Sequence, residues 1–231
     1  LVKFIEKKRD ESRVFLSVFG FGTGNLKASK LDKLANKGNG HYAYIDGQTE
    51  AKKVFVEEMT GMLYTIAKDV KIQVEFNPTQ VGSYRLIGYE NRMLTAQAFN
   101  DDKKDAGEIG AGHTVVALYE VELDREAYER RAPAFANVNL RWEDADSGRV
   151  SEISGDVFGE TLATSFTRSE PEFQLATTVA AYAEVLRNSR YLRGVSLDDV
   201  FDVARDLPFR ELDDAADEFL QLVEDAMRIA R

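Results

Sequence analysis

The chain has 231 residues, 44% of them hydrophobic and 10% aromatic, which indicates packed globular structure and excludes general disorder. Its formal net charge of -10 argues against nucleic acid as the main partner, because phosphate binding needs clustered Lys and Arg. The absence of cysteine excludes disulfides and thiolate metal sites, and no apolar run is long enough to span a bilayer.

The first segment, residues 1–63, has the pattern of one repeat of a doubly wound α/β domain. Residues 14–21 are apolar on both alternating sets of positions apart from Ser17, which predicts a strand covered on both faces, as in parallel sheets. We expect the other repeats of such a domain to lie before Leu1. An uncovered apolar strand invites pairing, so self-association through residues 13–21, or cover by a later part of the chain, is expected.

A helix and a second strand follow in this segment. Ser29 with Asp32 predicts a capping box at the start of the helix, and residues 41–46 read as the next strand. Residues 48–63 carry apolar side chains at helical spacing, which predicts one helix packed on the sheet.

The second segment, residues 64–158, reads as an antiparallel β module, in the form of a small sandwich. Residues 69–76 alternate strictly, which predicts a half-buried strand. Its core face would carry Val70, Ile72, Val74 and Phe76, and its solvent face Lys71, Gln73 and Glu75. Further strands follow, separated by turn residues, with residues 144–148 as a hairpin loop.

The third segment, residues 159–231, reads as a helical subdomain, so that the whole chain belongs to the α+β class. The stripe expected to face the core of its first helix consists of Leu175, Val179, Tyr182 and Leu186. Ser196 with Asp199 predicts a capping box for a second, short helix. Residues 209–231 predict a third, which turns Leu212, Ala216, Phe219, Val223 and Met227 inward.

A glycine-rich loop after the first strand invites a dinucleotide-binding interpretation. It precedes a helix, and Asp46 ends the next strand where a ribose-binding acid would lie. The dinucleotide-binding fingerprint, G-x-G-x-x-G, requires a third glycine at position 25 after Gly20 and Gly22, however, and the chain has Asn25 there. The sequence of this loop therefore argues against nucleotide binding.

An acidic loop within residues 100–113 is a second candidate site, for a cation. Its acids are Asp101, Asp102, Asp105 and Glu108. Their spacing matches no EF-hand, and two lysines lie among them, so a solvated, self-neutralising loop is favoured over a calcium site.

No catalytic constellation is recognisable in the sequence. His41 and His113 are far apart in the chain, and neither belongs to a motif with metalloenzyme spacing. There is no nucleophile elbow and no cysteine nucleophile. Trp142 reads as β-module core, with a carbohydrate-stacking platform as its alternative. The chain is expected not to be an enzyme.

Two stretches resemble a known family. Residues 18–46 resemble the late strands and helices of a bacterial von Willebrand factor type A domain. Residues 69–94 and 99–120 resemble the domain that follows it in one bacterial family, so the chain is expected to hold the end of the type A domain and this C-terminal domain.

The resemblance implies a non-enzymatic, adhesion-type protein of the bacterial cell envelope or periplasm, with protein partners. Such domains often bind Mg or Ca at a metal-ion-dependent adhesion site, but the family's ligand motifs would all lie before Leu1. No residue here is therefore expected to be a metal ligand, and no cofactor is expected in this chain. The rim of that upstream site would be formed by Gly22, Thr23, Gly24 and Asn25. The alternative function makes the β module a binder of a glycan or a peptide.

Overall fold

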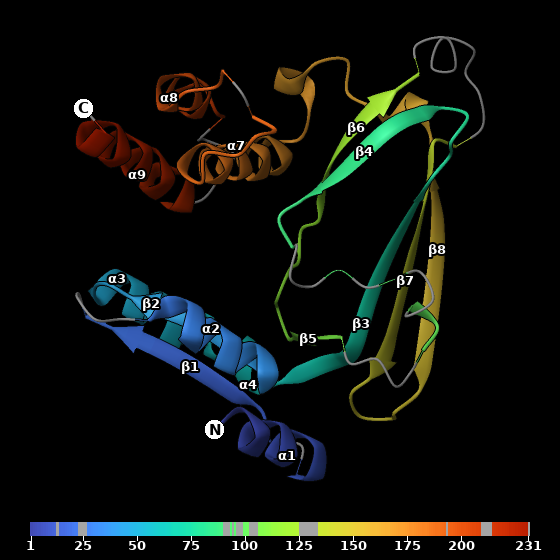
Figure 1. The fold of residues 1–231 in the computed structure, drawn as a ribbon, viewed down its shortest axis with the longest axis vertical. Helices are drawn as coiled ribbons and strands as arrows, with labels where there is room; N and C mark the ends of the chain where they lie inside the picture. Colours follow the sequence, from blue (N-terminus) through green and yellow to red (C-terminus); the bar gives the residue numbers. More distant parts are fainter. Residues whose placement is uncertain are drawn as a thin grey trace. The chain divides into compact units, whose positions relative to one another are not determined.

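The computed structural model describes residues 1–12, 14–22, 27–89, 93, 95, 99–101, 106–124, 134–192, 194–208 and 214–230 (Figure 1). The chain divides into two compact units, each assembled from separate stretches of sequence. The first comprises residues 1–77, 91–115 and 134–157, and the second comprises residues 78–90, 116–133 and 158–231. The three consecutive segments expected from the sequence stay a prediction. Within the described ranges, no helix has the length and apolar character needed to cross a membrane.

The first unit begins with a short α/β portion. Helix α1 (Val2–Ser12) precedes β1 (Leu16–Phe21), α2 (Ala28–Lys37) and β2 (Asn39–Ile45). β1 and β2 pair in parallel, as the sequence predicts, with α2 as the crossover. The expected cover of β1 is only partial, because most of the strand is half-buried and its last residue is exposed.

One local prediction in this portion is wrong, and a second is confirmed only in part. α2 has Lys27 at its N-cap and no side-chain cap, so Ser29 and Asp32 form no capping box there. Residues 48–63 form an interrupted helix: α3 (Gln48–Lys52), a π-helical turn (Lys53–Glu57) and α4 (Met59–Leu63). The π turn rotates the helix face and still buries Val54.

The larger sheet of this unit has the strand order β5-β3-β7-β8 and is antiparallel throughout. Its strands are β3 (Thr65–Phe76), β5 (Gly107–Gly110), β7 (Ala136–Asp144) and β8 (Val150–Val157). β3, β7 and β8 run side by side as long strands (Figure 1). The predicted hairpin loop joins β7 to β8, where Asp144 accepts hydrogen bonds from the backbone and side chain of Ser147. β5 was not expected, since its residues lie in the acidic loop.

The prediction for burial along β3 is wrong at its centre. Ile72 is 45% exposed, whereas Lys71 is 2% exposed and is the more deeply buried of the two. A bulge around Asp69, whose φ is 51°, brings its carboxylate within 2.8 Å of the Lys71 ammonium. The ammonium also donates to the Asp101 carbonyl at 2.8 Å, so its charge and hydrogen bonds are satisfied on the side where solvent was expected.

The second unit combines a two-stranded antiparallel sheet with helices. β4 (Val81–Ile87) pairs with β6 (Leu118–Leu123). Two short 3-10 turns, Gly159–Thr161 and Phe166–Arg168, precede α7 (Pro171–Leu186), α8 (Leu197–Arg205) and α9 (Asp214–Ala230). The core shared by the three helices consists of Tyr182, Val200, Ala204, Phe219 and Val223. A sandwich of the β-sheets stays a prediction.

The capping box predicted for Ser196 and Asp199 is confirmed at the start of α8. In α9, Ala216, Phe219, Val223 and Met227 lie inward as predicted, while Leu212 is outside the described residues. The predicted α7 stripe is only half right, since Leu175 and Tyr182 face the core but Val179 and Leu186 are exposed. The buried face turns instead toward Gln174 and Thr178, because the Thr178 hydroxyl donates to the Gln174 carbonyl and the Gln174 amide to Ser169.

Candidate functional site

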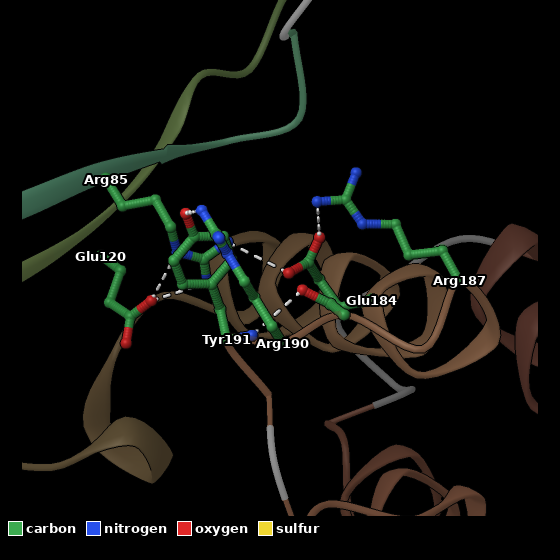
Figure 2. Close-up of polar contacts among 7 residues, drawn as sticks. Arg85, Glu120, Glu184, Arg187, Arg190 and Tyr191 are labelled. Carbon is green, nitrogen blue, oxygen red and sulfur yellow. Dashed lines mark hydrogen bonds and ion pairs between the residues drawn. The ribbon is translucent and has the colours of Figure 1, made fainter.

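A dense polar network lies within the second unit, where β4 and β6 meet α7 (Figure 2). Its centre is Arg85. The guanidinium donates through Nε and Nη2 to Glu120 Oε2, at 2.9 and 2.6 Å, and through Nη1 to Glu184 Oε2 at 3.0 Å. Arg187, at the end of α7, pairs with the other oxygen of Glu184 at 2.7 Å. Two carboxylates and two guanidiniums therefore form one chain of ion pairs across three elements.

Tyr191 completes this network. Its ring centre lies 4.3 Å from the Arg85 guanidinium carbon and 4.8 Å from that of Arg190. Figure 2 shows the ring beside both groups, and Arg190 Nη2 donates to the tyrosine oxygen at 2.6 Å. Guanidinium groups on an aromatic face gain cation–π stabilisation. The loop after α7 is thereby held to strand β4.

The electrostatics of Arg85 indicate a structural role. Burial acts to lower the pKa of Arg85, but its hydrogen bonds to Glu120 and Glu184 outweigh this, so its pKa is raised above its ordinary value. The guanidinium therefore stays charged, and each of its three nitrogens already donates to a carboxylate. The arrangement positions a sheet on a helix and is not built to capture an anion.

Of the four residues expected to form the rim of an upstream metal site, the structure describes only Gly22. Gly22 has a φ of +79°, and its carbonyl accepts a hydrogen bond from the Tyr44 hydroxyl at 2.8 Å. Thr23, Gly24 and Asn25 lie outside the described residues. The proposed rim role stays a prediction.

The acidic loop is likewise described only at its ends. Asp101 uses its carbonyl to accept from Lys71, and Glu108 accepts from the Asn39 amide at 3.3 Å. Asp102 and Asp105 are outside the described residues. Among the residues that the structure does describe, no three His, Asp or Glu side chains are grouped closely enough to hold a metal ion.

The structure brings together the two histidines that the sequence separates. His41 on β2 and His113, three residues beyond β5, have ring centres 5.3 Å apart with a tilt of 51°. Both belong to the first unit. Sequence reasoning missed this pair because their proximity depends on how β2 and β5 pack, which no local motif encodes.

An apolar sheet face is the other notable surface of the first unit. The register aligns Ile72, Leu140 and Ile153 across three strands, with Trp142 two residues further along β7 on the same side. Ile72 and Ile153 are exposed to 45% and 58%, and Trp142 is half-buried. The opposite face is polar, as the register pairs Arg141 with Glu152 and Asn137 with Asp156.

Comparisons with known proteins identify relatives. Residues 61–229 match the family model described as "Uncharacterized protein YfbK, C-terminal". The chain is 35% identical over 238 residues to the protein named "Uncharacterized protein YfbK" from Escherichia coli (strain K12). That match covers 96% of this chain and 40% of the relative, so the chain spans less than half of the relative's length.

A solved structure, the crystal structure of the ArnB paralog VWA2 from Sulfolobus acidocaldarius, matches with a TM-score of 0.42 and 13% identity. It covers 95% of this chain and 54% of that chain, and it assigns no detail of fold or function here. The family match and the curated relative confirm the expected von Willebrand factor type A-associated protein. The chain belongs to the YfbK family and carries its C-terminal domain.

Proposed function

We propose that this chain is part of a non-enzymatic protein-interaction protein of the bacterial cell envelope. The observation that supports this function most is the open apolar face of the β3-β7-β8 sheet. Its row of Ile72, Leu140 and Ile153 is continuous across three strands, and both outer isoleucines are about half exposed. Contiguous exposed apolar patches mark interaction sites on otherwise polar proteins.

Charge supports the same proposal. The chain carries 30% charged residues and a net charge of -10, so an uncovered apolar row contrasts with its surroundings. The other side of the same strands is lined by ion pairs and amides, including Arg141 with Glu152 at 3.2 Å. A partner that buries the apolar row gains hydrophobic energy without having to desolvate those charges.

Photo-crosslinking in the bacterium tests this proposal with a matched pair of positions. A photoreactive phenylalanine analogue replaces Ile153, and in a second strain it replaces Ser154, the next residue on the opposite face of β8. We expect discrete protein adducts from position 153 and a clear excess over position 154. Equal labelling at both positions, or none at either, would refute a docking role for this face. Fractionation of the same cells tests the envelope location.

If the full-length protein binds its partner as an adhesion protein, the proposal includes a divalent cation, Mg or Ca, at a metal-ion-dependent adhesion site. The resemblance to type A domains supports it, with the ligands expected outside this chain. Chelation of the full-length protein is expected to release a captured partner, and retention of the partner would argue for a metal-free scaffold.

Trp142 favours a second candidate function, binding of a glycan or peptide by the β module. Its indole lies on the apolar face beside the Leu140 row, where a sugar ring or an apolar side chain can stack. Trp142 is the single tryptophan, so fluorescence excited at a wavelength that the nine tyrosines do not absorb reports on this face. Titration with oligosaccharides and with apolar peptides is expected to change its emission, and an unchanged spectrum with both would exclude this function.

A further inference from the structure

The histidine pair in the first unit has a geometry that suits metal coordination. These are the only two histidines of the chain, and they come from a parallel strand and from the segment that follows β5. Their ring centres are 5.3 Å apart. A metal–nitrogen bond of about 2.0–2.1 Å places each ring centre roughly 3.2 Å from the ion, so two imidazoles at a tetrahedral angle have centres about 5 Å apart.

We propose that His41 and His113 bind one divalent transition-metal ion of the Zn²⁺, Ni²⁺ or Cu²⁺ class, which ties strand β2 to the segment after β5. Imidazole nitrogen suits these ions, whereas Mg²⁺ and Ca²⁺ require oxygen ligands. The site therefore differs in chemistry from an adhesion site. It does not depend on the proposed interaction function.

Hydrogen bonds hold the backbone of the two residues that carry these rings. The His41 amide donates to the Ser17 hydroxyl at 3.2 Å, and the His113 amide donates to the Gly110 carbonyl at 3.1 Å. Beside them, Asn39 donates to Glu108 at 3.3 Å, which joins the same two strands. Both histidines thus extend from a connection between β2 and β5 that other hydrogen bonds already hold in place.

The composition of the site sets its affinity. Since the described residues offer no third His, Asp or Glu within a metal-binding group, water completes the coordination. His113 is exposed, which gives an ion and its waters direct access. Two imidazoles without a third protein ligand give a weaker site than the three- and four-ligand zinc sites of enzymes and zinc fingers. An exchangeable ion is therefore expected.

A simple aromatic contact is the rival explanation, because aromatic rings commonly pack with their centres about 4.5–7 Å apart without any metal. The two explanations differ in whether both imidazole rings bind a metal ion that is added to the protein. The chain has no cysteine and these two histidines only, so binding of Zn²⁺ through imidazole must involve these two side chains. Carboxylate binding is distinguished by Ca²⁺, which acids take and imidazoles do not.

The test uses the tag-free chain, because a histidine tag would bind the same ions. Zn²⁺ is titrated by calorimetry at pH 7.5, and substoichiometric Ni²⁺ is added while the two imidazole proton signals are followed by NMR. We expect one Zn²⁺ per chain and simultaneous broadening of both signals. Broadening of one signal alone, or of neither, would overturn the proposal.

Variants separate this site from the acidic surface. His41→Gln and His113→Gln are each expected to weaken Zn²⁺ binding at least tenfold, with Ca²⁺ affinity unchanged and the fold intact by circular dichroism. Glu108→Gln is the matched control, expected to change the Zn²⁺ affinity less than threefold. Binding that survives both histidine substitutions but is lost in Glu108→Gln would show a carboxylate site instead and refute the proposal.

Discussion

Arg85 on β4 and Glu184 on α7, which are 99 positions apart in the sequence, form an ion pair with an Nη1–Oε2 distance of 3.0 Å. Glu184 is 4% exposed, so its charge depends on partners rather than on water. Arg187 supplies a second cation to the same carboxylate. The pair therefore links a strand to a helix within the second unit and holds a charge in a nearly dry position.

Arg85→Ala is expected to destabilise the chain by about 2–4 kcal/mol, because it leaves Glu184 buried with one cation fewer. The measurement is the free energy of unfolding from urea titration. Arg205→Ala is the matched control: Arg205 pairs with Asp202 on the exposed surface of α8, and its loss should cost less than about 0.5 kcal/mol. Equal costs for the two variants would show that the Arg85 network contributes no more than a surface pair.

The capping box of α8 predicts a pH dependence. Hydrogen bonds from the Ser196 side chain and then its backbone hold the pKa of Asp199 below its ordinary value. The folded state therefore favours the carboxylate, so this contribution to stability is complete at neutral pH. It is lost as the pH falls from the ordinary carboxyl pKa, about 4, through the lower folded value.

The check is the urea midpoint of the chain and of Asp199→Asn at pH 7 and at low pH. We expect the variant to be less stable at pH 7 and the difference to shrink as Asp199 becomes protonated. Asp198→Asn changes a neighbouring acid outside the capping box and should leave this pH dependence in place. A difference that stays constant with pH would contradict the assigned role.

The sequence predicted the structure correctly where side chains within a single turn, helix or strand–helix–strand unit determine it. The Ser196 box, the turn at Asp144 and the inward face of α9 follow from side-chain chemistry within one turn or one helix. The parallel pairing of β1 with β2 follows from the apolar character of β1 and its crossover helix. Each of these needs no information from the rest of the chain.

Burial was mispredicted where tertiary contacts reverse a local rule. Lys71 is buried because Asp69 and the Asp101 carbonyl receive its ammonium, and a bulge creates that arrangement. One signal did exist for the Arg85 network. Glu184 is the single charged residue in the apolar run from Phe173 to Leu186, and a lone carboxylate in such a run predicts a buried cation beside it. The contact of His41 with His113 had no such signal.

Gly40→Ala is expected to disrupt the β1-β2 pair. A methyl group on Gly40 would overlap the backbone carbonyl of Leu16, which has no flexible end that could move aside. Overpacking of this kind costs about 1–3 kcal/mol or more when backbone must shift. Gly47→Ala is the matched control, since its added methyl meets nothing within 4 Å. Amide exchange of β1, measured for both variants, should increase only in Gly40→Ala, and unchanged protection there would contradict the close approach.

Val223 and Leu222 are adjacent on α9 and test the helical core of the second unit. Val223 is 0% exposed and packs in the cluster with Tyr182 and Phe219, whereas Leu222 is 52% exposed. Val223→Ala should cost about 2 kcal/mol, because it removes buried methyl groups and leaves a cavity. Leu222→Ala removes a larger side chain but should cost less than about 0.5 kcal/mol, since solvent already covers it. Urea unfolding of both variants decides the point: the reverse order of costs would mean that α9 packs through its other face, and the core described for α7, α8 and α9 would then be incorrect.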